Sequence, residues 1–189
     1  MKKLVFVCFS ALLFSAVANA GILIEPFVGY STGSGKASGN ASGISYSTTD
    51  TENGAIFGAR AGYSFALLSF GAEYEGGSLA ANSKVNISGV QTTVTGTSTM
   101  TNLGAFAEIN LPIIDGYVGY FPSAQATSSG TTNSGSAFQI GIGYKMLPLI
   151  NVNLEYLNSS YNKTNDSSTT GYSASGSLYI LSVSLPINI

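Results

Sequence analysis

The sequence contains no histidine and no tryptophan, and its single cysteine is Cys8. Without histidine, a Ser-His dyad or triad cannot be built, and the commonest ligand of zinc and copper is missing. One cysteine cannot form an internal disulfide, which excludes the disulfide scaffolds of small secreted proteins. We therefore predict a non-enzymatic protein with no catalytic residue, no cofactor and no metal site.

Charge is also scarce, because only 8% of the residues are charged, whereas about 25% is usual in soluble domains. No basic patch is present, so nucleic acid is excluded as a partner. After the first 20 residues no run of about 18 apolar residues occurs, which excludes transmembrane helices. Hydrophobic residues still make up 44% of the chain. They alternate with polar ones, which is typical of a membrane β-barrel with an apolar outer face.

The beginning of the chain has the pattern of a secretory signal. Two lysines precede an apolar run over 4–14, and residues 18–20 read Ala-Asn-Ala, a typical cleavage site. The apolar run is too short to span a membrane as a helix. We predict a signal peptide over 1–20 and a single barrel domain over 21–189.

Eight segments show the alternation of apolar and polar residues that predicts β-strands. In each segment one set of side chains is apolar, and the other set holds glycines and most of the charges. Lipid outside and a polar interior satisfy all eight segments, whereas a soluble secreted β-sandwich would need charges on its outer face. The predicted strands are 22–32, 55–65, 68–78, 100–111, 115–123, 136–146, 149–158 and 176–188.

The connections between these strands alternate in length. Short turns are predicted near 66–67, 112–113 and 147–148, and long polar loops over 33–54, 79–99, 124–135 and 159–175. This pattern is typical of outer-membrane proteins, with short periplasmic turns, long extracellular loops and both termini in the periplasm. We predict an all-β fold, an eight-stranded antiparallel up-and-down transmembrane β-barrel. Asp50 and Glu52, in the first long loop, are interpreted as solvated acids.

The charged residues of the strands fall on the predicted interior face. Reflection of the chain about the turn at 66–67 places Arg60 opposite Glu73, and we predict an ion pair there. An eight-stranded barrel has little interior space, so these side chains are interpreted first as a polar plug and second as a gate in a narrow pore. The predicted lumen charge network is Glu25, Arg60, Glu73, Glu108, Lys145 and Glu155.

Aromatic residues fall near the ends of the predicted strands, where they would form girdles at the two membrane interfaces. The predicted girdle residues are Tyr30, Phe57, Tyr63, Phe65, Phe70, Tyr74, Tyr120, Phe138, Tyr144, Tyr156 and Tyr179.

Three segments carry a resemblance to a known family: Glu25-Pro26-Phe27-Val28-Gly29-Tyr30, Phe57-Gly58-Ala59-Arg60-Ala61-Gly62-Tyr63 and Ile140-Gly141-Ile142-Gly143-Tyr144. The chain resembles the small bacterial outer-membrane barrels of the OmpA-transmembrane-domain, OmpX and opacity type. The resemblance implies contact with outer-membrane phospholipid and lipopolysaccharide, and insertion by the barrel-assembly machinery. Members usually end in an aromatic residue that this machinery recognises, and here the last residue is Ile189.

These observations predict a structural or surface-interaction role, such as adhesion or binding of an unidentified surface ligand by the loops. The alternatives are a narrow porin-like channel for small solutes or cations and, with less support, a lipid-modifying enzyme. Partial alternation over Val85–Thr95 indicates that the third and fourth strands extend beyond the membrane. Such an extension would expose a strand edge to which a partner could add a strand.

Overall fold

The computed structural model describes residues 20–41, 44–147, 149–165, 167–168 and 172–189. The predicted signal peptide lies outside the described residues except for Ala20, and its cleavage stays a prediction. Within the described residues the regular structure is entirely β, and no helix is long and apolar enough to cross a membrane.

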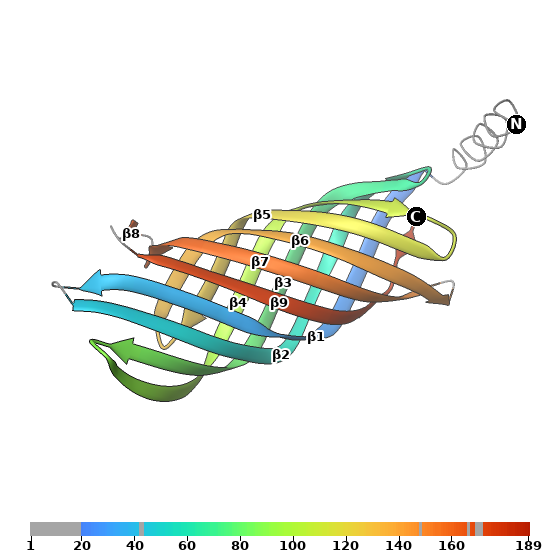
Figure 1. Cartoon of the computed structure of the whole chain (residues 1–189). Helices are drawn as coiled ribbons and strands as arrows, with labels where there is room; N and C mark the ends of the chain where they lie inside the picture. The colour runs from blue at the N-terminus through green and yellow to red at the C-terminus, as the bar shows by residue number, and fades with distance from the viewer. Residues whose placement is uncertain (1–19, 42–43, 148, 166, 169–171) are drawn as a thin grey trace, which may run out of the picture.

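Among the described residues, eight long antiparallel strands close into one ring (Figure 1). The ring closes because β9 pairs with both β7 and β1. This confirms the predicted eight-stranded barrel, and the soluble two-sheet sandwich is wrong. The strands are β1 (Gly21–Ala41), β2 (Ile44–Phe65), β3 (Leu68–Ile87), β4 (Val90–Asn110), β5 (Ile114–Ser128), β6 (Thr131–Leu147), β7 (Ile150–Thr164) and β9 (Ser173–Ser184). Two short strands extend the ring, β8 (Ser167–Ser168) beside β7 and β10 (Ile187–Asn188) beside β1.

The two ends of the barrel differ. At one end, here called the turn end, β2 and β3 are joined by two residues, of which Ala66 has a φ of 59°. The C-terminus lies at the same end, where the main chains of Ile22 and Ile189 exchange two hydrogen bonds of 2.9 and 3.0 Å. The opposite end, here called the hairpin end, carries the tips of the four long hairpins (Figure 1).

The prediction of long polar loops is wrong over most of its range. The β1–β2 ladder continues to Ala41 opposite Ile44, and the β3–β4 ladder continues to Ile87 opposite Val90. The segment 79–99 is rich in threonine and valine, which favour strands, and in both hairpins each added residue pair extends an existing ladder. The extension of the third and fourth strands, predicted from Val85–Thr95, is confirmed.

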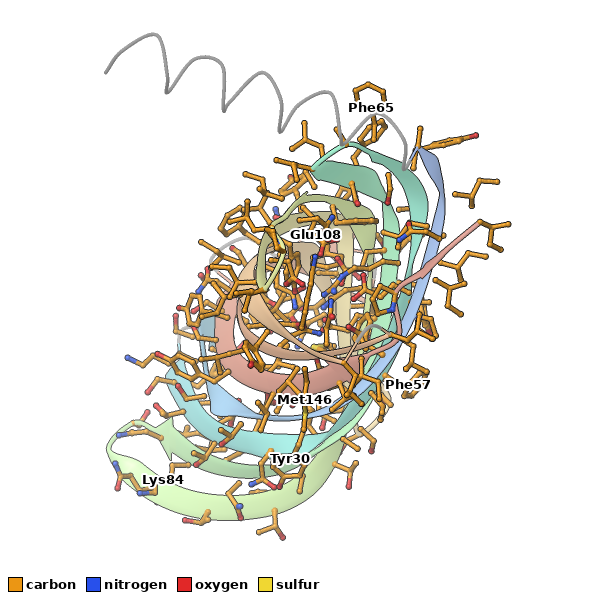
Figure 2. All side chains as sticks on the ribbon, turned by 90° about the vertical axis from the view of Figure 1, so that its right-hand side faces the viewer. Tyr30, Phe57, Phe65, Lys84, Glu108 and Met146 are labelled. Atoms are coloured by element: carbon orange, nitrogen blue, oxygen red, sulfur yellow. The ribbon has the colours of Figure 1, made fainter. Side chains whose placement is uncertain are left out.

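Alternation along the strands separates an apolar outer face from a filled interior. Figure 2 shows Tyr30, Phe57 and Phe65 on the outside and Glu108 within the ring. Phe57 exposes 57% of its surface, whereas Arg60 on the same strand exposes 2%. The apolar outer band runs from Ile22 to Tyr30 on β1, and beyond it the outward residues are polar. This band is the surface that lipid covers in an outer-membrane barrel.

Two inward glycines, Gly62 on β2 and Gly71 on β3, lie directly opposite each other near the turn end. A Cβ atom added to Gly62 would collide with the main-chain oxygen of Phe70, and one added to Gly71 would collide with that of Ala61. The two strands therefore approach at this point in a way that leaves no space for a side chain.

Candidate functional site: the barrel interior and its mouth

Arg60 is at the centre of the interior and contacts three carboxylates from three different strands. Its Nε lies 3.1 Å from Glu73 Oε1, in the register predicted from the turn. Its Nη1 and Nη2 lie 3.4 Å from Glu25 Oε1 and 3.2 Å from Glu155 Oε1. β1, β2, β3 and β7 thus all contribute to one ion cluster, which connects opposite walls of the barrel.

Aromatic rings enclose the same guanidinium. Arg60 Cζ lies 3.9 Å from the centroid of the Tyr117 ring and 5.0 Å from that of Phe27. A buried charge is costly unless it is paired and hydrogen-bonded, and this one has both carboxylate and aromatic partners. Among the residues that the structure describes, the cation in the centre of the lumen is thus fully paired.

Glu75, which the predicted network omits, is also fully buried and extends this cluster. Asn102 Nδ2 donates to Glu75 Oε1 at 3.3 Å, and Gln139 Nε2 donates to Glu75 Oε2 at 3.3 Å. Gln139 also donates to Glu155 Oε2 at 2.8 Å, which links Glu75 to the Arg60 cluster. The strand alternation already assigns Glu75 to the same face as Glu73, so the sequence contains the signal that places it inside.

A second polar layer fills the turn end. Glu108 is buried there, and Asn151 donates to Asp115 Oδ2 at 2.9 Å. Lys145, predicted as part of the lumen network, is only half-buried and donates to Asn110 Oδ1 at 3.3 Å. It forms no ion pair with a carboxylate of the described residues. Lys145 therefore lies apart from the Arg60 cluster.

An apolar layer lies between the Arg60 cluster and the hairpin end. On most strands it occupies the next inward position beyond a polar residue: Phe27 follows Glu25, and Leu157 follows Glu155. Sequence reasoning missed this layer because it expected a polar interior throughout. Its buried residues are Phe27, Ile56, Leu79, Met100, Phe121, Ala124, Ala137, Leu157, Leu178 and Ile180. The ion cluster and the apolar layer therefore lie one beyond the other along the interior, which in an eight-stranded barrel has room for little besides side chains.

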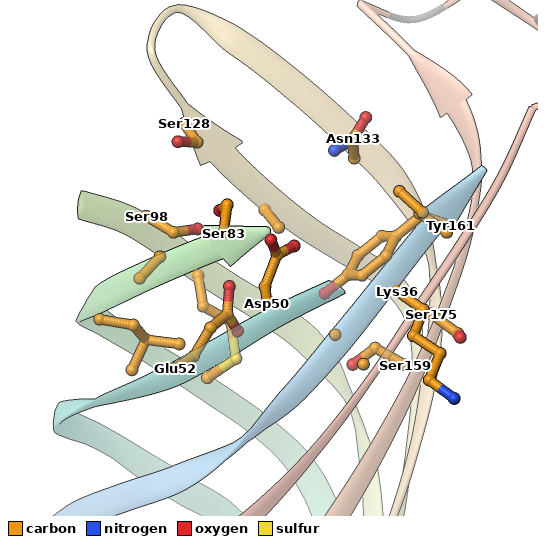
Figure 3. A pocket seen from close by; sticks show the side chains of 18 of the residues that line it. Lys36, Asp50, Glu52, Ser83, Ser98, Ser128, Asn133, Ser159, Tyr161 and Ser175 are labelled. Atoms are coloured by element: carbon orange, nitrogen blue, oxygen red, sulfur yellow. The ribbon is translucent and has the colours of Figure 1, made fainter. Parts of the chain in front are cut away.

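A cavity of about 130 Å³ opens above the apolar layer, at the mouth of the hairpin end. Leu79, Met100 and Leu178 form its floor, and serine, asparagine and tyrosine side chains line its walls. Asp50 and Glu52, interpreted from the sequence as solvated acids, point into this cavity (Figure 3). Burial raises the pKa of the Glu52 carboxyl, and the neighbouring Asp50 carboxylate raises that pKa further.

The predicted girdle residues lie on the outer face. All are exposed except Tyr156, which is half-buried and packs on Tyr179 with ring centroids 5.3 Å apart. Tyr63, Phe65 and Phe70 lie close to the turn end, and Tyr30 and Phe57 lie farther towards the hairpin end. The described residues contain no group of three or more Asp, Glu, His or Cys side chains that could hold a metal ion.

Comparison with known proteins agrees with this architecture. Residues 6–183 match the family described as outer membrane protein beta-barrel domain. The chain belongs to this family. Its strands therefore span a bacterial outer membrane, and its exposed apolar band is the lipid-facing surface. No curated protein matches the chain.

Solved structures of similar fold are outer-membrane barrels. OprG from Pseudomonas aeruginosa is 14% identical, with 90% of this chain and 98% of that chain covered and a TM-score of 0.53. AlkL, solved in lipid bilayers, is also 14% identical, with 90% and 92% covered and a TM-score of 0.51. At this level of identity the similarity shows a shared fold alone.

Proposed function

We propose that this outer-membrane barrel is a closed, non-enzymatic surface protein that binds an extended peptide along the free edge of β4. In this proposal the hairpin end faces the outside of the cell. The position of the C-terminus and of the start of β1 at the turn end supports that orientation, because short turns and termini face the periplasm in such barrels.

The observation that carries the proposal is the missing partner of β4 over residues 90–97. β4 pairs with β3 from Val90 onwards, but its pairing with β5 begins only at Ser98, opposite Ser128. Residues 90–97 are all exposed, and the hairpin projects sideways from the ring in Figure 2. Every second residue over 90–97 therefore directs its main-chain N–H and C=O to an edge with no strand partner among the described residues, and a peptide can add a strand there. At the end of this edge the Thr97 carbonyl accepts a hydrogen bond of 3.4 Å from Ser128 Oγ.

The side chains around the edge indicate the chemistry of the peptide. The sequence over 90–97 is Val-Gln-Thr-Thr-Val-Thr-Gly-Thr, with no charge and no proline to block pairing. Val94 lies opposite Ser83, which lines the mouth cavity, so both residues are on the cavity side of the β3–β4 hairpin. Thr93 lies opposite Lys84, and both are on the outer face of this hairpin. The best-fitting partner is thus an extended segment with small apolar side chains on one face and an acidic side chain towards Lys84.

Two features favour this role over the alternatives. The apolar layer and the ion cluster occupy the lumen, which supports a plug and disfavours a channel for solutes or cations. The chain also contains no histidine, which disfavours the hydrolytic chemistry of a lipid-modifying enzyme.

The proposal is tested by selection from a display library of random peptides about ten residues long, with the purified barrel held in lipid nanodiscs. Enriched peptides are expected to alternate small apolar and polar residues. Thr93→Pro and Val94→Pro are then compared, because neighbouring residues of a strand direct their N–H groups to opposite edges. Only one of the two variants removes an N–H donor from the free edge. That variant should bind peptide about tenfold more weakly, which corresponds to the loss of roughly one hydrogen bond.

Thr93→Ala is the matched control, since it changes the same side chain and retains the main-chain donor. Binding by Thr93→Ala should equal that of the wild type, and heat-modifiable gel migration should show that all variants form the barrel. Failure to enrich any peptide, or equal binding by both proline variants and the wild type, would overturn the proposal.

A further inference from the structure

The mouth cavity combines an apolar floor with an acidic wall. Leu79, Met100 and Leu178 close it from below, and Asp50 and Glu52, two residues apart on β2, line one side. Tyr161 on β7 points into the same space from the opposite wall (Figure 3). The cavity is thus a concave site with a small apolar floor and largely polar walls.

The two carboxylates have no cationic partner among the described residues. Asp50 Oδ1 is buried and accepts no hydrogen bond, and Glu52 forms no ion pair. Lys36 borders the cavity, but its side chain is exposed and points away from it (Figure 3). The other lysines near this end, Lys84 and Lys163, are exposed as well. A buried carboxylate oxygen without a partner is costly, so a bound cation would stabilise it.

The number of oxygen ligands argues against a divalent metal ion. Calcium takes about six to eight oxygen ligands, and no group of three candidate side chains occurs in the described part of the chain. An ammonium group needs fewer partners, because it donates three hydrogen bonds and is also attracted to aromatic rings. The apolar floor further favours a cation that carries a hydrocarbon group.

We propose that this cavity binds a small organic ammonium ion whose nitrogen lies between Asp50, Glu52 and Tyr161 and whose short hydrocarbon group rests on Met100. The size agrees, because the cavity measures about 130 Å³ and an apolar protein cavity of about 150 Å³ holds benzene. Burial and then the neighbouring Asp50 carboxylate raise the pKa of Glu52, as expected for an acidic wall with no cation beside it. This site is separate from the free edge of β4 and does not depend on peptide binding there.

The methionine methyl groups provide a direct test. After removal of the predicted signal peptide only Met100 and Met146 remain. Met100 lies in the cavity floor, whereas Met146 is an exposed residue at the turn end. Titration of methyl-labelled protein in nanodiscs with n-butylammonium chloride should shift the Met100 resonance in a saturable way and leave Met146 unchanged. Equal concentrations of n-butanol and sodium butyrate should leave Met100 unshifted, because neither the alcohol nor the butyrate anion carries a positive charge on its hydrocarbon group.

Substitutions identify the residues that bind the cation. Asp50→Asn/Glu52→Gln should weaken n-butylammonium binding by at least about tenfold, because both charged acceptors are removed. Lys36→Gln is the matched control at the rim and should bind at least as well as the wild type. The proposal is overturned if Met100 does not shift, if n-butanol shifts it equally, or if the double variant binds like the wild type. A shift produced by calcium chloride but not by n-butylammonium would identify a metal site instead and would also overturn it.

Discussion

Replacing Arg60 with alanine should lower the free energy of unfolding of the barrel by about 3–5 kcal/mol, the usual cost of removing one partner from a buried ion pair. Glu25, Glu73 and Glu155 would then lose the guanidinium that they share, in a part of the interior that water does not reach. Urea unfolding in phospholipid vesicles measures the change. The heat-modifiable band of Arg60→Ala should also be weaker than that of the wild type.

Two controls separate this effect from a general loss of positive charge. Lys145→Ala should change the unfolding free energy by less than about 1 kcal/mol, because Lys145 is half-buried and forms no ion pair with a described residue. Arg60→Met combined with glutamine at positions 25, 73 and 155 should recover part of the loss, since it removes the buried charges together. Equal destabilisation by Arg60→Ala and Lys145→Ala would show that the cluster does not stabilise the interior.

Alanine at Gly62 or Gly71 should destabilise the barrel by about 1–3 kcal/mol, the typical cost of inserting a group where no space exists. A Cβ atom at either position collides with the main chain of the facing strand, which cannot move away as a flexible side chain would. The ladder between β2 and β3 would have to open beside the turn at Ala66. The same vesicle unfolding assay measures the loss.

Gly96→Ala is the matched control for these substitutions. It also places a methyl group in a strand, but no atom lies within 4 Å of the added Cβ. Its unfolding free energy should therefore equal that of the wild type or exceed it slightly, because alanine has less conformational freedom in the unfolded chain. If Gly71→Ala is as stable as Gly96→Ala, the strands do not approach as closely as described.

The sequence predicts the barrel well because alternation is a local property that each strand shows by itself. Alternation assigns Arg60 and Glu73 to one face of the sheet, and the short turn after Phe65 fixes the register of β2 and β3. The proximity of these two residues therefore follows from the hairpin geometry alone. The third partner, Glu155, lies 95 positions from Arg60 in the chain. Only closure of the ring brings it near, and alternation indicates its face but not its contacts.

The hairpin extensions and the apolar layer could not be predicted in the same way. Polar residues over 33–54 and 79–99 match both a loop and a solvated strand, and pairing with a neighbour decides between them. Ile56, Leu79 and Leu157 lie at the ends of the predicted membrane strands or beyond, where their inward direction depends on the extension of those strands. The mouth cavity depends on the same extension, and so the sequence alone suggests solvated acids at Asp50 and Glu52.

We expect a closed lumen and binding at the hairpin end. The most direct test is the current through a planar lipid bilayer that contains the purified wild-type protein, with folding of the same preparation shown by its heat-modifiable band. The current is also measured for Phe121→Ala/Leu157→Ala, which removes two large side chains of the apolar layer, and is compared with that of the wild type. The wild type should show no discrete current steps at either polarity. Steady discrete openings of the wild-type protein would contradict the closed lumen and would favour a narrow channel.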